Sequence, residues 1–301
     1  MTAARSQRRV AFVAVCSLAT LHLLVYLRFF TENVGWSGIA FYEFTACFAV
    51  PVVFLRMRAS SGKDRLGWLV MTVAVAATAV LDTGWSIADQ AMAGGIGYPN
   101  WFDPFYLSSY VAYIVAVGLL TSPLWRGRDR RWMFDAGALM AISAGLLWHF
   151  VIPRTGDGSV LTSLLGCTYL VFDLCFFGTV LTAAYTSRLT VRNALVMAAA
   201  TILATGDVLY YFEAIAFDAS WLAGIWIVVI AATVDQNRAI RMPRLRFARA
   251  GAIPYVFVAA VGLVTLEEMR RGSADALLLT AVVALALIVA RQIITLRRAL
   301  A

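Results

Sequence analysis

The sequence predicts an all-α integral membrane protein with about ten transmembrane helices, and three observations lead to this fold class. Of the 301 residues, 61% are hydrophobic and only 14% are charged, which is too apolar for a soluble domain. Apolar runs of the length needed to cross a bilayer, about 20 residues, recur along the whole chain. The basic residues gather in the short segments between these runs, as in multi-span membrane proteins.

The ten predicted spans follow one another with short connections. The first apolar run comes after Arg8-Arg9, but it is longer than the hydrophobic region of a signal peptide, so we interpret it as a retained span. The spans are expected at residues 10–30, 37–57, 66–89, 103–121, 132–152, 160–185, 193–215, 219–235, 252–268 and 274–294.

The distribution of basic residues predicts that both termini are cytoplasmic. With the N-terminus inside, only Arg28, Arg154, Arg270 and Arg271 of the 25 Lys and Arg residues fall in outer segments. Loops rich in Lys and Arg stay on the cytoplasmic side of a membrane. In a soluble protein, the formal net charge of +8 would suggest a nucleic-acid partner. Here the basic residues are expected to face anionic headgroups, so membrane lipids, and no nucleic acid, are the expected partners.

The chain contains an internal repeat of four helices. The pattern Phe-Asp-x-x-aromatic-Leu occurs at residues 102–107 and again at 217–222, and Leu-Val-Met occurs at 69–71 and 195–197. Because four is an even number, both copies have the same orientation in the membrane, which makes the repeat parallel rather than inverted. The predicted domains are two four-helix repeats at 1–121 and 122–235, a basic cytoplasmic linker at 236–251 and a C-terminal two-helix hairpin at 252–301.

Carboxylates inside the predicted spans are the main functional signal, because each costs about 2.5–3.5 kcal/mol at the centre of a membrane helix. Asp82 and Trp85 are three residues apart and share one helix face, as do Asp207 and Tyr210. Together with Glu43, which is expected at a similar depth, they are candidates for an outward-facing pocket between the repeats. A carboxylate beside an aromatic ring suits a cationic or hydroxyl-bearing ligand. The alternative is that these side chains hydrogen-bond neighbouring helices and fix their packing.

The second repeated pattern supplies further candidates. Asp103 and Asp218 each begin a predicted helix, and Asp103 precedes Pro104, so capping of the helix is the alternative to ligand binding. Tyr106 and Trp221 follow at positions that suit either a binding site or an aromatic belt at the membrane interface. The candidate ligand-binding residues are Glu43, Asp82, Trp85, Asp103, Tyr106, Asp207, Tyr210, Asp218 and Trp221.

The sequence shows no pattern that is typical of an enzyme or of a metal site. The two histidines, His22 and His149, lie on different predicted spans, and the four cysteines lie in apolar runs without metal-ligand spacing. Common hydrolase and nucleotide-binding motifs are missing from the sequence. Lys63 is the only lysine and lies between spans, which excludes a retinal Schiff base. We therefore expect no catalytic residues, no metal and no cofactor.

The last predicted span continues into a polar helix with a short heptad pattern. Val289, Ile293, Leu296 and Leu300 are spaced by four, three and four residues. This spacing is that of a coiled-coil seam, although an ordinary helix end would also produce it. As a seam it predicts a homodimer through the C-terminal helix, which would then carry a signal out of the membrane.

Several of these motifs together carry a family resemblance. They are the Asp-x-x-aromatic motifs near span ends, Tyr98-Pro99, Asp103-Pro104-x-Tyr106-Leu107-x-x-Tyr110, and a last span that runs into Arg291-Gln292-x-x-x-Leu296-Arg297. In them the chain resembles the multi-span N-terminal sensory regions of bacterial membrane-bound diguanylate cyclases and phosphodiesterases (GGDEF and EAL proteins). The resemblance implies a non-enzymatic sensory domain of the bacterial inner membrane. Such a domain detects a small molecule or a membrane state and signals through its last helix to a cytoplasmic GGDEF- or EAL-type output domain.

Two other functions compete with this hypothesis. Ten spans in about 300 residues are also similar to the drug/metabolite transporter class of small-solute carriers, but that class consists of five-helix inverted repeats. A matching superposition of residues 10–121 on 132–235 without inversion would favour the sensor, and a five-plus-five inverted match would favour the transporter. A scaffold that only assembles partners is the third hypothesis. It predicts that asparagine at Asp82 and Asp207 leaves every binding measurement unchanged.

Overall fold

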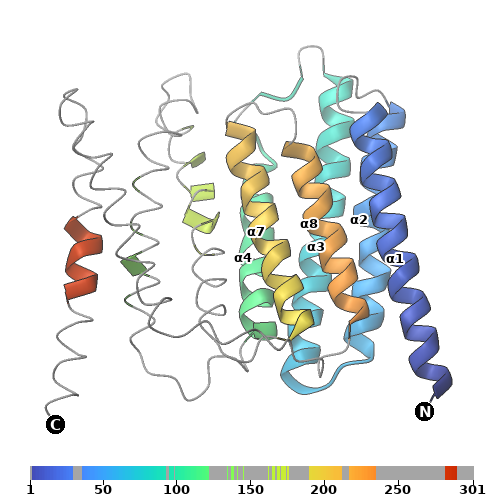
Figure 1. Cartoon of the computed structure of the whole chain (residues 1–301). Coiled ribbons are helices and arrows are strands. Elements are labelled where there is room, and N and C mark those ends of the chain that lie inside the picture. Colours follow the sequence, from blue (N-terminus) through green and yellow to red (C-terminus); the bar gives the residue numbers. More distant parts are fainter. Residues whose placement is uncertain are drawn as a thin grey trace, which may run out of the picture. The chain divides into compact units, whose positions relative to one another are not determined.

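The computed structural model describes residues 2–29, 36–92, 95–97, 99–121, 190–211, 217–234 and 282–289, together with scattered positions between 134 and 175. These residues are α-helical apart from short turns, which confirms the all-α prediction for this part of the chain. Figure 1 labels six helices, α1 (Thr2–Phe29), α2 (Trp36–Arg58), α3 (Gly62–Ala91), α4 (Asp103–Thr121), α7 (Val191–Tyr211) and α8 (Phe217–Thr233).

Four of these helices are long and apolar enough to cross a membrane, so the chain is a membrane protein. They are α1 from Val10 onward, α2, α3 and α4, and they coincide with the first four predicted spans. α7 and α8 lie where the seventh and eighth spans are predicted, and α8 is apolar but shorter. The remaining predicted spans fall mostly or wholly outside the described residues, apart from a helical segment at 282–289.

The chain divides into two compact units that do not follow sequence order. One unit consists of Met1–Pro123 and Thr190–Ile240, and it contains all six labelled helices. The other consists of Leu124–Leu189 and Arg241–Ala301. In this second unit Ala138, Ala284 and Ile288 form a buried apolar cluster. The predicted domain at 1–121 falls within the first unit, whereas the predicted domain at 122–235 is shared between the two.

Five helices of the first unit form a closed ring. α2 packs on α3, α3 on α4, α4 lightly on α7, α7 on α8, and α8 returns to α2, while α1 packs mainly on α8 (Figure 1). Small residues lie buried at these contacts, among them Ala49 of α2 and Ala74 of α3. At Gly224 of α8 an added Cβ would lie 2.5 Å from Cγ of Leu203 on α7. Such residues allow the close helix approach on which packing in lipid depends.

His22 joins three helices as a buried structural residue. Its Nε2 lies 2.8 Å from the carbonyl oxygen of Phe41, which can only accept, so Nε2 carries the proton. Nδ1 is then the acceptor for the indole N–H of Trp226, at 3.4 Å, and the hydroxyl of Thr45 lies at the same distance. The imidazole also stacks on the Phe41 ring, with the centroids 4.1 Å apart. These contacts connect α1, α2 and α8.

A tight turn joins α2 to α3 at one end of the ring. The Ser60 N–H donates to the carbonyl of Met57, and the Ser60 hydroxyl donates to the carbonyl of Arg56 at 2.9 Å. Gly62 follows with a φ of 54°, a left-handed conformation that glycine adopts without strain. The turn therefore brings the last residues of α2 close to the first residues of α3.

Candidate functional site

Each of the five ring helices contributes one carboxylate near the same end of the ring. Glu43, Asp82, Asp103, Asp207 and Asp218 come from α2, α3, α4, α7 and α8, in that order. Glu43, Asp103 and Asp207 are buried. Asp82 interacts electrostatically with Glu43, Asp207 and Asp218, so these carboxylates lie close together. We call these five residues the carboxylate cluster, and the end of the ring where they lie the carboxylate end.

Asp82 and Asp207 make equivalent hydrogen bonds in the two halves of the chain. The Tyr106 hydroxyl donates to Oδ1 of Asp82 at 2.8 Å. The Trp221 indole N–H donates to Oδ1 of Asp207, also at 2.8 Å. Tyr106 and Trp221 are the aromatic residues of the two Phe-Asp-x-x-aromatic patterns. In both halves, the Asp near the end of one helix is therefore bound by the aromatic residue in the first turn of the next.

Further aromatic hydroxyl groups connect the cluster across the ring. Tyr110 of α4 donates a hydrogen bond to Oδ2 of Asp207 on α7, which joins the two halves. Tyr26 of α1 donates to Oδ2 of Asp218 at 3.2 Å. Neither tyrosine is among the candidate ligand-binding residues predicted from the sequence, although Tyr110 belongs to the motif that carries the family resemblance. Tyr110 follows Tyr106 by four residues and so shares its helix face, which is a usable signal, whereas no local pattern marks Tyr26.

Glu43 is held by two hydroxyl groups of α3. The hydroxyl of Thr83 lies 3.1 Å from Oε2 of Glu43, and that of Ser86 lies 3.4 Å from Oε1. Thr83 and Ser86 are three residues apart and therefore share the α3 face that meets α2. Glu43 thus contributes to the α2–α3 contact as well as to the cluster.

The turn before α4 positions Tyr106 for its hydrogen bond to Asp82. α4 begins at Asp103, as predicted, but the residue that caps it is Phe102, because the carbonyl of Phe102 accepts the N–H groups of Phe105 and Tyr106. Asp103 instead accepts the backbone N–H of Asn100 at 2.7 Å. The side-chain oxygen of Asn100 accepts the N–H of Phe102 at 2.9 Å. These two bonds fix the path by which the chain enters α4.

Trp85 and Tyr210 lie at the edge of the cluster. Trp85 is 36% exposed and Tyr210 is 47% exposed, so both face away from the interior of the ring. The Tyr210 ring remains near Trp221, with centroids 6.1 Å apart. From the predicted set, the structure brings together Glu43, Asp82, Tyr106, Asp207, Asp218 and Trp221. Asp103 lies at the same end of the ring, where it interacts electrostatically with Tyr210.

The cluster offers carboxylate oxygen acceptors on several helices. Within the described ranges, no three His, Cys, Asp or Glu side chains lie close enough to hold one metal ion together. The groups that donate hydrogen bonds to these carboxylates are neutral: hydroxyl, indole and backbone N–H groups. Several carboxylates this close in apolar surroundings are stabilised by protons or by a bound cation. The arrangement therefore suits an organic ligand large enough to reach two carboxylates.

Gly206 allows Trp221 to reach Asp207. A Cβ added at Gly206 would lie 2.4 Å from Cδ1 and 2.6 Å from Nε1 of Trp221, so the indole would have to move. We expect Gly206→Ala to break the Trp221–Asp207 bond and to lower the free energy of unfolding by about 1–3 kcal/mol, as measured by SDS titration in mixed micelles. Gly97→Ala is the matched control, because a Cβ there meets no atom within 4 Å. Equal stability of the two variants would contradict this account.

The geometry of the carboxylate cluster allows a ligand to be recognised through hydrogen bonds. The carboxylate oxygens can accept N–H or O–H groups of a ligand in place of the tyrosine and tryptophan donors. Exchange of partners at these oxygens would alter contacts between helices. No protein-family model, no curated protein sequence and no solved structure matches this chain.

Proposed function

We propose that this protein is a membrane sensory domain whose carboxylate cluster binds a small cationic or hydroxyl-bearing molecule. One observation carries the proposal. Asp82 and Asp207, one from each half of the chain, hold equivalent hydrogen bonds and lie within electrostatic reach of each other. Because every helix of the ring contributes to the cluster, a ligand bound there would act on the whole ring.

The proposed mechanism is an exchange of hydrogen-bond donors. A ligand ammonium or hydroxyl group would replace the Tyr106 hydroxyl at Asp82 or the Trp221 indole at Asp207. Both aromatic residues belong to the helix that follows their Asp, so their release would loosen the α3–α4 and α7–α8 contacts. A ligand shifts such an equilibrium only by binding one arrangement more tightly than the other. The positive charge of an ammonium group would supply that preference among the carboxylates.

We further propose the complete arrangement that the sequence predicts. It has ten spans, two parallel four-helix repeats and cytoplasmic termini, in the bacterial inner membrane. The last helix would pair in a homodimer and pass the signal to a GGDEF- or EAL-type output domain. The equivalent contacts of the α3–α4 and α7–α8 hairpins support the parallel repeat, because in each hairpin the Asp lies late in the first helix.

The test is a ligand-dependent change in stability of the full chain in nanodiscs. The probes are primary amines, quaternary ammonium compounds and polyols, and the readout is the unfolding temperature. We expect at least one probe to stabilise the wild type, by about 2.7 kcal/mol at 100 times its dissociation constant. Asp82→Asn and Asp207→Asn should lose this stabilisation.

Asp89→Asn is the matched control for the binding experiment. Asp89 lies two turns after Asp82 on α3 and accepts the N–H of Ile96 at 2.8 Å, which an amide oxygen can also accept. This variant should respond like the wild type. A probe that stabilises all four proteins equally does not bind at the cluster. If no probe distinguishes Asp82→Asn from Asp89→Asn, the proposed site is wrong.

A small-solute transporter is the second candidate, because carboxylates shared between two halves of a membrane protein also suit cation-coupled transport. The two functions differ in one measurement. A transporter moves its solute into proteoliposomes, and Asp82→Asn would stop this uptake. A sensor binds the same molecule without moving it. The common direction of the α3–α4 and α7–α8 hairpins favours the sensor over the inverted five-helix repeats of that transporter class.

A further inference from the structure

An open groove of about 610 Å³ lies between α1 and α2, two helices that are long and apolar enough to cross a membrane. α1 packs mainly on α8 and only weakly on α2, so the space between α1 and α2 is left open. A groove of this size falls within the range of about 300–1,000 Å³ that ligand sites occupy. We call it the α1–α2 groove, and its apolar walls are Leu18, Leu21, Val25, Ala40, Phe41 and Phe44.

The groove has the depth of one lipid leaflet. On α1 its wall runs from Leu18 to Val25, and Arg28 follows one turn later. Leu18 and Arg28 are ten residues apart, or about 15 Å along a helix. The hydrocarbon core of a bilayer is about 30 Å thick, and half of that thickness is one leaflet. Because the apolar span of α1 ends at Phe29, Arg28 lies where the headgroups begin.

A guanidinium group lies at the end of the groove. Phe29 follows Val25 by four residues and so continues the groove face of α1. The guanidinium carbon of Arg28 is 5.4 Å from the centre of the Phe29 ring, which places the positive charge over this face. Ser37, in the first turn of α2, lines the groove and adds an exposed hydroxyl group. The groove therefore combines apolar walls with a cationic, hydroxyl-bearing end.

We propose that the α1–α2 groove binds one acyl chain of an anionic phospholipid whose phosphate pairs with Arg28. A negatively charged head on a long apolar tail matches the two parts of the groove. A guanidinium group pairs with a phosphate through two N–H donors, and the Ser37 hydroxyl supplies a further donor. A zwitterionic headgroup would bring its own ammonium group beside Arg28, so a net negative charge is preferred. Both helices lie in the membrane, so lipid reaches the groove by lateral diffusion.

The bound chain would stabilise the position of α1. His22 also lines the groove, and its imidazole connects α1, α2 and α8. Tyr26 follows His22 by one turn and donates to Asp218 of the carboxylate cluster. A lipid chain that fills the space between α1 and α2 would therefore hold α1 where Tyr26 reaches the cluster.

The experiment measures the unfolding temperature of the full chain in a neutral detergent to which lipid is added. Phosphatidylglycerol and phosphatidylcholine with the same acyl chains are compared, and glycerol 3-phosphate supplies the headgroup phosphate without a chain. We expect phosphatidylglycerol to stabilise the wild type more than phosphatidylcholine does, and glycerol 3-phosphate to have no effect. Arg28→Gln should need roughly ten times more phosphatidylglycerol for the same stabilisation, because a charge-assisted hydrogen bond to the phosphate is lost.

Two pairs of variants separate the groove from general effects of charge and size. Arg58→Gln removes an exposed arginine from the last turn of α2, at the end of that helix away from Ser37, and should respond like the wild type. Ala40→Trp fills the groove and should abolish the preference for phosphatidylglycerol. Leu55→Trp adds the same side chain on α2 outside the groove and should keep that preference.

All four substitutions are at exposed positions, so each variant is expected to fold. The proposal is overturned if phosphatidylglycerol stabilises the wild type no more than phosphatidylcholine does, or if glycerol 3-phosphate is as effective as the lipid. It is also overturned if Arg28→Gln and Arg58→Gln need the same lipid concentration, or if Ala40→Trp responds like Leu55→Trp.

Discussion

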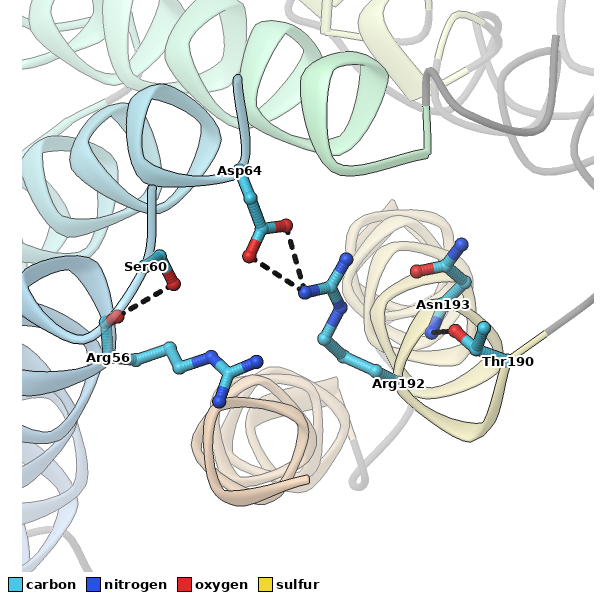
Figure 2. Close-up of polar contacts among 6 residues, drawn as sticks. All are labelled: Arg56, Ser60, Asp64, Thr190, Arg192 and Asn193. Carbon is cyan, nitrogen blue, oxygen red and sulfur yellow. Dashed lines mark hydrogen bonds and ion pairs between the residues drawn. The ribbon is translucent and has the colours of Figure 1, made fainter. Parts of the chain in front are cut away.

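Replacement of Asp64 by alanine is expected to lower the free energy of unfolding by about 3–5 kcal/mol, the range for breaking one side of a buried ion pair. Asp64 is the described counter-ion of Arg192, whose side chain has no exposed surface. The Arg192 Nη1 lies 2.8 Å from Oδ1 and 2.9 Å from Oδ2 of Asp64 (Figure 2). The substitution removes both short contacts to Nη1 and leaves a guanidinium in the interior without a carboxylate. SDS titration in mixed micelles measures the loss.

Two further variants separate the ion pair from general effects of charge. Asp89→Ala removes a carboxylate from the opposite end of α3 and should change stability far less. Asp64→Leu combined with Arg192→Met removes both charges and should regain most of the stability, because no buried charge is left unpaired. If Asp64→Ala is as stable as Asp89→Ala, the ion pair does not hold α3 and α7 together.

Trp226→Ala is expected to lower the free energy of unfolding by about 3 kcal/mol. Trp226 is a fully buried residue of α8 that donates to His22 and lies 5.5 Å from the Phe48 ring, measured between centroids. Truncation of a buried tryptophan costs about 3–5 kcal/mol in soluble proteins. The lower end applies here because lipid, unlike water, tolerates the apolar surface, so mainly the cavity is costly.

The controls for Trp226 use the same residue type. Trp101→Ala should have little effect on stability, because Trp101 is 61% exposed. Trp226→Phe keeps most of the volume and removes the hydrogen bond to His22, so we expect a loss of about 1 kcal/mol. A loss for Trp226→Ala no larger than that for Trp101→Ala would mean that the contact between α1, α2 and α8 does not depend on this side chain.

The features that can be predicted from the sequence are those that depend on one segment at a time. The first four spans follow from the length and polarity of single apolar runs. Asp82 and Asp207 were recognisable because carboxylates in such runs are costly. Their aromatic partners were also within reach, because Tyr106 and Trp221 occupy the same position in the two repeated patterns.

The features that could not be predicted depend on which helices pack together. The spacing of three residues placed Trp85 with Asp82 on one helix, but it does not show which side of that face meets a neighbour, and the structure leaves Trp85 exposed. Tyr26 reaches Asp218 across 192 residues, with no local signal in either segment. Arg192 was counted among the basic loop residues that predict the orientation of the chain. Only the fold shows that the Arg192 side chain is buried against Asp64.

The contacts of α7 have a mechanical consequence. Arg192 holds one end of this helix to α3, and Asp207 accepts a hydrogen bond from Tyr110 of α4 near the other end. The two points are 15 residues apart along the chain, or about 22 Å along a helix. A helix held by side-chain contacts at two such points resists rotation about its own axis. When the hydrogen bond between Tyr110 and Asp207 breaks, α7 stays attached to α3 through Arg192. The displacement of α7 then grows with distance from Arg192 towards the carboxylate end.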